Sequence, residues 1–289
     1  MAIFVNKDTL VVCQGITGTQ ASFHVKNSLD YGTKVVAGVT PDKGGTLHLG
    51  LPVFNTLQEA VKETKATASV MYVPASQLKT AVREAVEAEL DLAVSIAADV
   101  PLRDMLEIKA MLRGCKTKLI GPNTPGIITP DEARLGIFPV DIHKKGNIGV
   151  VSRSSTLTYE AVLSIDRAGL GQSTVVGLGD DILIGVDFID VISAFNHDDE
   201  TKAIVMIGQL SGPFEEAAAE WYKRQHNKKP VIAFVAGDAM PFDHNMGYAG
   251  DILTNGYVSV QDKKDALADA GMIVVNSVSD ITKALVSLK

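Results

Sequence analysis

Short β-branched runs alternate with longer helical segments along the chain, and this alternation occurs twice. It is typical of βαβ units, whose right-handed crossovers place helices on both faces of a parallel sheet. The segment 122–146 separates the two series and contains four prolines and three glycines. We therefore predict two α/β domains with parallel sheets: a Rossmann-like domain over residues 1–125 and a flavodoxin-like domain over 126–289, with the junction within 122–146.

The predicted elements follow from apolar periodicity and flanking turn residues. Strands are expected at Leu10–Gln14, Lys34–Thr40, Ala68–Val73, Leu92–Ile96, Lys118–Gly121, Ile148–Ser152, Ser173–Gly177, Ala203–Gly208, Pro230–Ala236 and Met272–Asn276. Helices are expected near Thr19–Tyr31, Thr56–Glu63, Ala75–Glu89, Leu102–Arg113, Thr156–Ala168, Val186–Asn196, Phe214–His226, Lys263–Ala270 and Ser279–Ser287.

Composition excludes several classes of protein. The 289 residues are 46% hydrophobic and 21% charged, as in globular proteins. A formal net charge of −7 argues against a nucleic-acid partner, which would need a basic face. Two cysteines predict neither a disulfide framework nor a zinc site, and we expect no metal site in this chain. Without a signal peptide or an apolar run near the roughly 20 residues of a membrane span, a cytoplasmic protein is expected, away from membranes.

The first glycine-containing turn, Gly15–Ala21, follows a predicted strand and precedes a helix. It is a shortened relative of the dinucleotide fingerprint, in which backbone amides at a helix N-terminus approach a phosphate. Thr17, Gly18, Thr19 and Gln20 are the candidate contacts. The alternative is a tight βα turn with no ligand.

The next strand leads into Asp42, Lys43 and two glycines. An NAD site would place an acid at the strand's end for the ribose hydroxyls. A lysine and free amides suit a phosphorylated ribose better, such as the 3′-phosphate of coenzyme A. A solvated lysine in a turn remains the alternative.

In the second half, a predicted strand leads into Arg153, Ser154, Ser155 and Thr156. Hydroxyl residues at this position cap helix amides, and the same amides can bind a phosphoryl group. The Gly-x-Ser-x-Gly elbow of serine nucleophiles is absent. We therefore interpret Ser154, Ser155 and Thr156 as phosphate contacts, with simple capping as the alternative.

These segments, together with others along most of the chain, resemble the α subunits of ADP- or GDP-forming succinate–CoA ligases. The matching stretches are collinear with that family and comprise residues 15–20, 31–41, 48–54, 121–130, 156–161 and 203–208. The resemblance implies that the first domain binds CoA and that the second forms half of the active site. It also implies a separate β subunit with an ATP-grasp fold, which binds ATP or GTP with magnesium.

In the family, a histidine of the α subunit carries phosphate from the nucleotide to the acid, and the CoA thiol then attacks the acyl phosphate. The resemblance implies that Tyr159 lies near the acid. It implies CoA contacts at Thr17, Gly18, Thr19, Gln20 and Lys43, with backbone help from Ile96, Ala97 and Ala98.

The sequence departs from the family where phosphate is handled. Tyr248 stands where the phosphorylated histidine is expected, and Gln209 replaces the glutamate that holds it. Ala97 and Ala98 replace a Thr-Glu pair that contacts CoA, and Ser155 replaces a glycine. Asp180 brings a negative charge into a Gly-Gly-Asp-Pro loop, where it would repel phosphate.

These changes leave three hypotheses. A phenol with a pKa near 10 is a poor nucleophile without a base, so Tyr248 does not replace the histidine directly, and His244 would serve only in a remodelled loop. The chain is then a subunit of a ligase for succinate or a related carboxylic acid, passing phosphate directly from nucleotide to carboxylate. The second hypothesis is a CoA- or acyl-CoA-binding pseudoenzyme that pairs with or regulates a ligase. The third, a nicotinamide-dependent dehydrogenase, is disfavoured by Lys43.

Overall fold

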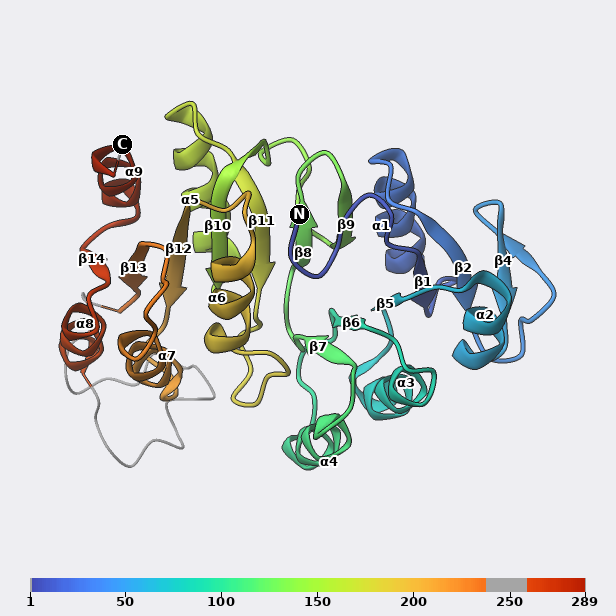
Figure 1. Cartoon of the computed structure of the whole chain (residues 1–289). Helices are drawn as coiled ribbons and strands as arrows, with labels where there is room; N and C mark the ends of the chain where they lie inside the picture. Colours follow the sequence, from blue (N-terminus) through green and yellow to red (C-terminus); the bar gives the residue numbers. More distant parts are fainter. Residues whose placement is uncertain (1, 238–258, 289) are drawn as a thin grey trace.

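The computed structural model describes residues 2–237 and 259–288. Within these ranges the chain forms two α/β lobes, each built on one seven-stranded sheet. In Figure 1 the lobe formed by the first half lies to the right and the lobe formed by the second half to the left.

The first lobe has the strand order β3-β4-β2-β1-β5-β6-β7. Its strands are β1 (Val11–Gln14), β2 (Val35–Val39), β3 (Leu47–His48), β4 (Leu51–Phe54), β5 (Ala68–Met71), β6 (Leu92–Ser95) and β7 (Lys118–Ile120). Its helices are α1 (Thr19–Asp30), α2 (Leu57–Thr64), α3 (Ala75–Glu87) and α4 (Leu102–Leu112).

The second lobe has the strand order β14-β13-β12-β10-β11-β8-β9. Its strands are β8 (Gly126–Thr129), β9 (Ala133–Gly136), β10 (Lys145–Ser152), β11 (Gln172–Gly177), β12 (Ala203–Gly208), β13 (Val231–Val235) and β14 (Ile273–Val275). Its helices are α5 (Ser155–Arg167), α6 (Phe188–His197), α7 (Phe214–Lys223), α8 (Val260–Asp269) and α9 (Val278–Ser287).

The predicted alternation of parallel strands and helices in two α/β units is confirmed. Every residue of the central strands β1, β5, β6, β11 and β12 is buried, as expected for strands covered by helices on both faces. The sheets are mixed rather than purely parallel, because β3 pairs antiparallel with β4, and β8 pairs antiparallel with both β9 and β11.

The segment 122–146 is not simply a turn-rich junction, because it contains β8, β9 and the start of β10. Its glycines serve strand pairing. Gly126 and Gly136 are register partners with φ of 103° and 123°. A Cβ on Gly126 would lie 2.0 Å from the Leu135 carbonyl oxygen. The chain passes from the first sheet to the second between β7 and β8, and residues 125/126 remain the proposed domain division.

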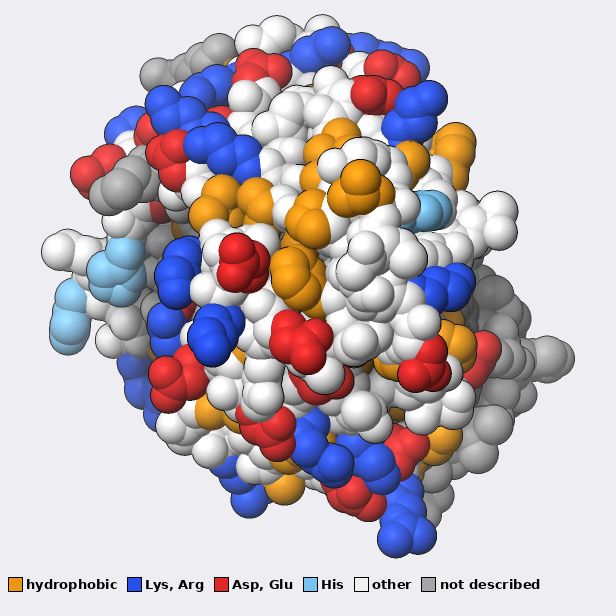
Figure 2. Space-filling view, turned by 90° about the vertical axis from the view of Figure 1, so that its right-hand side faces the viewer, with side chains coloured by type: hydrophobic (Ala, Val, Ile, Leu, Met, Phe, Trp, Pro, Cys, Tyr) orange, Lys and Arg blue, Asp and Glu red, His pale blue; other side chains and the backbone are white. Residues whose placement is uncertain are grey.

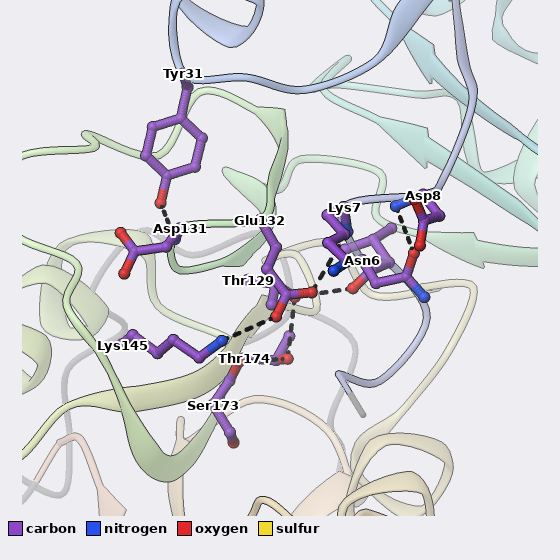
Figure 3. Close-up of polar contacts among 11 residues, drawn as sticks. Asn6, Lys7, Asp8, Tyr31, Thr129, Asp131, Glu132, Lys145, Ser173 and Thr174 are labelled. Carbon is purple, nitrogen blue, oxygen red and sulfur yellow. Dashed lines mark hydrogen bonds and ion pairs between the residues drawn. The ribbon is translucent and has the colours of Figure 1, made fainter.

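Polar contacts join the N-terminal segment to the second lobe (Figure 3). Thr129 Oγ1 donates to the Val5 carbonyl oxygen at 3.0 Å, and Glu132 accepts from the Lys7 amide at 3.4 Å. Glu132 also pairs with Lys145 at 3.2 Å. The first residues of the chain therefore help to hold the two lobes together.

A buried arginine crosses the same junction from β9. Arg134 is 3% exposed, and its Nη1 donates to the His24 carbonyl oxygen and to Ser28 Oγ on α1, both at 3.1 Å. Its Nε donates to the Phe138 carbonyl oxygen at 2.6 Å. Because a buried guanidinium needs all its donors satisfied, these bonds fix α1 against the second lobe.

The face of the first lobe seen in Figure 2 carries acidic and basic side chains interspersed around a group of hydrophobic ones. Exposed large hydrophobic residues of this lobe include Phe23, Leu47 and Leu49. Among the described residues, no helix has the length and apolar character needed to cross a bilayer.

Candidate active site

The glycine turn after β1 leaves the start of α1 open. Gly15 has φ of 83°, and a Cβ there would lie 2.7 Å from the Tyr72 carbonyl oxygen, so glycine is required. Gly18 occupies the N-cap position of α1, where no side chain caps the first amides. Gly18, Thr19 and Gln20 are exposed. The turn therefore presents uncapped amides at a helix N-terminus, as an anion site requires.

The loop after β2 lies against this turn. Lys43 Nζ donates to Thr17 Oγ1 at 3.1 Å, and Thr17 Oγ1 lies 3.3 Å from Thr40 Oγ1. The structure thus brings Lys43 beside Thr17 and adds a cation to the open helix N-terminus. Sequence reasoning missed a second contact, His48 Nε2 to Ser22 Oγ at 2.7 Å, which holds the β3–β4 hairpin against α1. No local pattern signals it, since the partners are 26 residues apart.

Ile96, Ala97 and Ala98 follow the carboxyl end of β6. The Ala97 carbonyl oxygen accepts from the Asn123 amide at 2.7 Å, and Ala98 is exposed. These residues share the carboxyl edge of the first sheet with the Gly15 turn, where ligands of open α/β sheets bind. Their contact with CoA remains a prediction.

In the second lobe, α5 begins directly after β10. Ser154 is its N-cap and accepts from the Leu157 amide, so the capping alternative accounts for this hydroxyl. Ser155 and Thr156 lie in the first turn, and Thr156 is exposed. Phosphate binding by Ser154, Ser155 and Thr156 remains a prediction.

Arg153, just before this cap, is 2% exposed. Its Nη1 donates to the Ser211 carbonyl oxygen at 2.6 Å and its Nη2 to the Asp181 carbonyl oxygen at 3.0 Å. The guanidinium lies 4.4 Å from the centre of the Phe214 ring. Arg153 therefore ties together the loops that follow β11 and β12.

Asp180 and Gln209 meet at the carboxyl edge of the second sheet. Burial raises the pKa of Asp180, whereas Arg153 and Gln209 act to lower it. Asp180 Oδ1 is buried and has no hydrogen-bond partner among the described residues. Asn123 Nδ2 donates to Asp181 Oδ1 at 3.0 Å. The carboxylate predicted for Asp180 thus lies in the region of Arg153 and Gln209, which both lower its pKa.

A buried ion pair fixes the backbone of Gln209. Glu215 Oε1 accepts from the Gln209 amide at 2.9 Å, and Glu215 Oε2 lies 2.7 Å from Lys263 Nζ. Both side chains are fully buried, and burial raises the pKa of Glu215. From sequence, Glu215 appeared only as an acidic residue in the first turn of a helix. Its pairing with Lys263 has no local signal, because the two residues are far apart in the chain.

The structure places Tyr159 on α5, and its predicted position near the acid remains a prediction. Its ring packs edge-on against Phe138 at 6.0 Å, and burial raises the pKa of its phenol while Arg134 lowers it. Its described neighbours belong to the junction between the lobes. Tyr248 and His244 lie outside the described residues. Among the residues that the structure describes, no cluster of three or more His, Cys, Asp or Glu could hold a metal ion.

Two family models match the chain: a CoA binding domain over residues 6–98 and a CoA-ligase domain over residues 151–276. The start of α1 and Lys43 lie within the first match, and the Arg153–Gln209 region lies within the second. The fold and the two matches define an α/β protein of the CoA-ligase class.

The chain belongs to the family of succinate–CoA ligase α subunits. It is 50% identical over 286 residues to the α subunit of ADP-forming succinate–CoA ligase from Staphylococcus aureus (strain Mu50), covering 99% of this chain and 94% of that protein. The corresponding subunit of Staphylococcus epidermidis (strain ATCC 12228) is also 50% identical over the same length.

Solved structures share the fold at lower identity. ATP citrate lyase from Methanosaeta concilii superposes with a TM-score of 0.87 at 23% identity. The match covers 99% of this chain, which spans about half (51%) of that lyase chain. An acetyl-coenzyme A synthetase from Ca. Korarchaeum cryptofilum gives a TM-score of 0.76 at 20% identity, covering 96% of this chain and 61% of the synthetase.

Proposed function

We propose that this chain is the α subunit of a nucleotide-dependent acid–CoA ligase. The reaction joins succinate or a related carboxylic acid to CoA and converts ATP or GTP to ADP or GDP and phosphate. The observation that supports this most strongly is the 50% identity to succinate–CoA ligase α subunits over nearly the whole chain. Residues 1–125 would bind CoA and residues 126–289 would form part of the catalytic site, in the cytoplasm.

CoA binding is assigned to the first lobe. Thr17, Gly18, Thr19 and Gln20 offer amides and hydroxyls at the open start of α1 to a phosphate of CoA. Lys43, beside Thr17, would pair with the 3′-phosphate of the ribose. Ile96, Ala97 and Ala98 would guide the pantetheine arm along the carboxyl edge of the sheet toward the second lobe. A CoA molecule bound there would supply the thiol that becomes acylated.

Activation of the acid is assigned jointly to this chain and a β subunit. The β subunit, of ATP-grasp type, would hold the nucleotide and magnesium. Ser155, Thr156 and the first amides of α5 would receive the phosphoryl group of the acyl phosphate. Tyr159, on the same helix, would lie near the acid at the junction between the lobes.

We further propose that phosphate passes directly from nucleotide to carboxylate. The backbone amide of Gln209 is held by Glu215, and a neutral side-chain amide cannot act as the anion that would orient an imidazolium. Tyr248, a phenol, would form a far less reactive phosphate ester than a phosphoramidate. Neither residue then needs to carry phosphate.

The test is to purify the chain with its β subunit and to measure CoA thioester formation by mass spectrometry. The assay supplies ATP or GTP, magnesium, CoA and one acid from a panel of mono- and dicarboxylic acids. We expect thioester and nucleoside diphosphate in equal amounts, each dependent on both CoA and the acid. CoA binding by calorimetry without any thioester from the whole panel would instead support the second candidate, a CoA-binding pseudoenzyme.

The pseudoenzyme is favoured by one observation. The Asp180 carboxylate lies close enough to Arg153 to offset its charge, which reduces the affinity of this edge for an anion. A Gln209→Glu, Tyr248→His double variant separates the two candidates. Activity that appears only in the double variant would show that the native chain has a ligase scaffold without catalysis.

A further inference from the structure

We propose that the Asp180 carboxylate is the proton acceptor for the CoA thiol in acyl transfer. This inference rests on the proposed ligase function and names a catalytic residue for it. It is carried by three observations on described residues: where Asp180 lies, how firmly it is held, and which of its atoms lacks a partner.

Asn123 places Asp180 next to the segment proposed to guide the pantetheine arm. The Asn123 amide donates to the Ala97 carbonyl oxygen at 2.7 Å, and the Asn123 carbonyl oxygen accepts from the Asp180 amide at 3.2 Å. One residue thus bridges the carboxyl edge of the first sheet and the loop that follows β11. A thiol arriving along Ile96–Ala98 would reach the second lobe at this loop.

The loop is held in one conformation. Gly179 has φ of 105°, and a Cβ there would lie 2.0 Å from the Pro122 carbonyl oxygen. On the other side of Asp180, Arg153 Nη2 donates to the Asp181 carbonyl oxygen at 3.0 Å, and Asn123 Nδ2 donates to the Asp181 carboxylate at 3.0 Å. A catalytic group must be held by its surroundings in this way to meet its substrate in a fixed geometry.

The carboxylate itself is incompletely satisfied. Its Oδ1 is buried without a hydrogen-bond partner among the described residues. Arg153, 2% exposed, has a buried Nε for which the described part of the chain offers no partner. An unsatisfied buried acceptor costs about 1–3 kcal/mol, which a thiol S–H donor would offset. The orphan oxygen is therefore suited to receive the proton of an incoming thiol.

The charges around Asp180 tune it as a base. Burial raises its pKa and the nearby Asp181 carboxylate adds to this, whereas Arg153 and Gln209 lower it. Among the neighbouring charges, Asp99 raises the pKa of Asp181 and Glu215 raises the pKa of Arg153. A carboxylate whose pKa is raised toward the working pH is a better base than an ordinary surface aspartate.

The thiol proton moves to an Asp180 oxygen while the sulfur lone pair forms a C–S bond to the acyl carbon of the acyl phosphate. The C–O bond to phosphate breaks, and its electron pair leaves with the phosphate. The proton then passes from Asp180 to the phosphate or to water, which restores the carboxylate.

The test compares Asp180→Asn with Asp99→Asn in the complex with the β subunit. Asp99 is an exposed carboxylate of the same junction, so its variant removes a nearby charge without removing the proposed base. Two reactions are measured for each: thioester formation with CoA, and hydroxamate formation when hydroxylamine replaces CoA. Hydroxylamine attacks acyl phosphates without losing a proton first, so it bypasses the base.

We expect Asp180→Asn to slow thioester formation about 100- to 10,000-fold, the usual effect of losing a general base, and to retain hydroxamate formation. The acidic limb of the pH–rate profile should disappear with it, and the KM for CoA should change little. Asp99→Asn should keep both reactions. Because hydroxamate formation requires a folded complex, it also serves as the folding control, and Asp180→Glu should restore part of the rate.

Equal loss of both reactions in Asp180→Asn, or thioester formation within tenfold of the native rate, would overturn the assignment of Asp180. Absence of both reactions in the native complex with every acid would instead count against the proposed ligase function. The two failures are therefore distinguishable.

Discussion

The two strand–helix turns of this chain sit at equivalent edges of their sheets but are built in opposite ways. In the first lobe, Gly18 leaves the start of α1 uncapped and Lys43 is exposed. In the second lobe, Ser154 caps α5 and Arg153 is buried among backbone carbonyls. The first turn keeps its polar groups available to a ligand, whereas the second uses most of its polar groups to hold its own loops.

This difference determines how each site responds to substitution. An exposed polar group that contacts only a ligand can be removed with little effect on folding, and its removal weakens ligand binding. A buried group that pairs with another part of the chain leaves an uncompensated partner behind when it is removed. The following predictions test this contrast, from the largest expected effect to the smallest.

Lys263→Met should destabilise the protein by about 3–5 kcal/mol, because it leaves the buried Glu215 carboxylate without its cation. Lys43→Met, in the first turn, should change stability by less than about 0.5 kcal/mol, since Lys43 is exposed. Urea unfolding of the two variants measures both values. Similar unfolding midpoints would show that the two edges do not differ in the way described.

A buried histidine at the junction between the lobes should make the stability of the protein depend on pH, an effect that neither strand–helix turn produces. His143 is 3% exposed, and burial lowers its pKa from 6.5 to about 4, although its bond to the Pro139 carbonyl oxygen opposes this. Between pH 6.5 and about 4, His143 is protonated in the unfolded chain but neutral in the folded chain, so the free energy of unfolding decreases as the pH falls. The shift corresponds to about 3 kcal/mol.

His143→Asn can keep a donor for the Pro139 carbonyl oxygen but cannot titrate. The native protein should therefore lose stability relative to this variant when the pH is lowered from 7 to 4, as measured by urea unfolding at each pH. Parallel stability curves for the two proteins over this window would mean that His143 is protonated in the folded state.

A matched pair of glycines gives a smaller effect. In Gly179→Ala, the alanine must adopt a positive φ, and its Cβ would lie 2.0 Å from the Pro122 carbonyl oxygen. The substitution should lower the free energy of unfolding by about 1–3 kcal/mol or more. Gly18 has φ of −71°, and its nearest atom to an added Cβ is 3.4 Å away, an ordinary contact. Gly18→Ala should thus preserve the melting temperature while weakening CoA binding, which calorimetry would detect.

Lys43 supplies the most specific prediction, since it affects CoA binding and leaves folding unchanged. Loss of one charge-assisted hydrogen bond to the 3′-phosphate should weaken CoA binding by about 1.5–3 kcal/mol, or roughly ten- to a hundredfold. Lys43→Ala should bind CoA and 3′-dephospho-CoA almost equally, while the native protein prefers CoA. A preference that persists unchanged in the variant would place the 3′-phosphate away from Lys43.

The same contrast explains how far the sequence could be interpreted. The fold and the first turn depend on contiguous residues, so apolar alternation and the Gly15–Gln20 spacing were enough to predict them. The position of Lys43 beside this turn was also predictable, because the strand that leads to Lys43 pairs with β1. The short strands β8 and β9 were missed because glycines needed for close strand pairing looked like turn residues.

The second site could not be predicted in the same way. The bonds of Arg153 to the Ser211 carbonyl oxygen and of Glu215 to Lys263 join residues 58 and 48 positions apart. Such pairs depend on how the segments after β10, β12 and β13 meet, which no local pattern encodes. The predicted role of Tyr159 near the acid came from resemblance alone and stays a prediction, since the packing of its ring against Phe138 does not test it.

The most direct test of the proposed chemistry is turnover of Tyr248→Phe in the complex with the β subunit, with γ-labelled ATP used to follow phosphate. Direct transfer predicts that thioester formation continues at a similar rate and that the native α subunit never acquires label. Loss of turnover in Tyr248→Phe, together with labelled native α subunit, would contradict direct transfer and show that the tyrosine carries the phosphate.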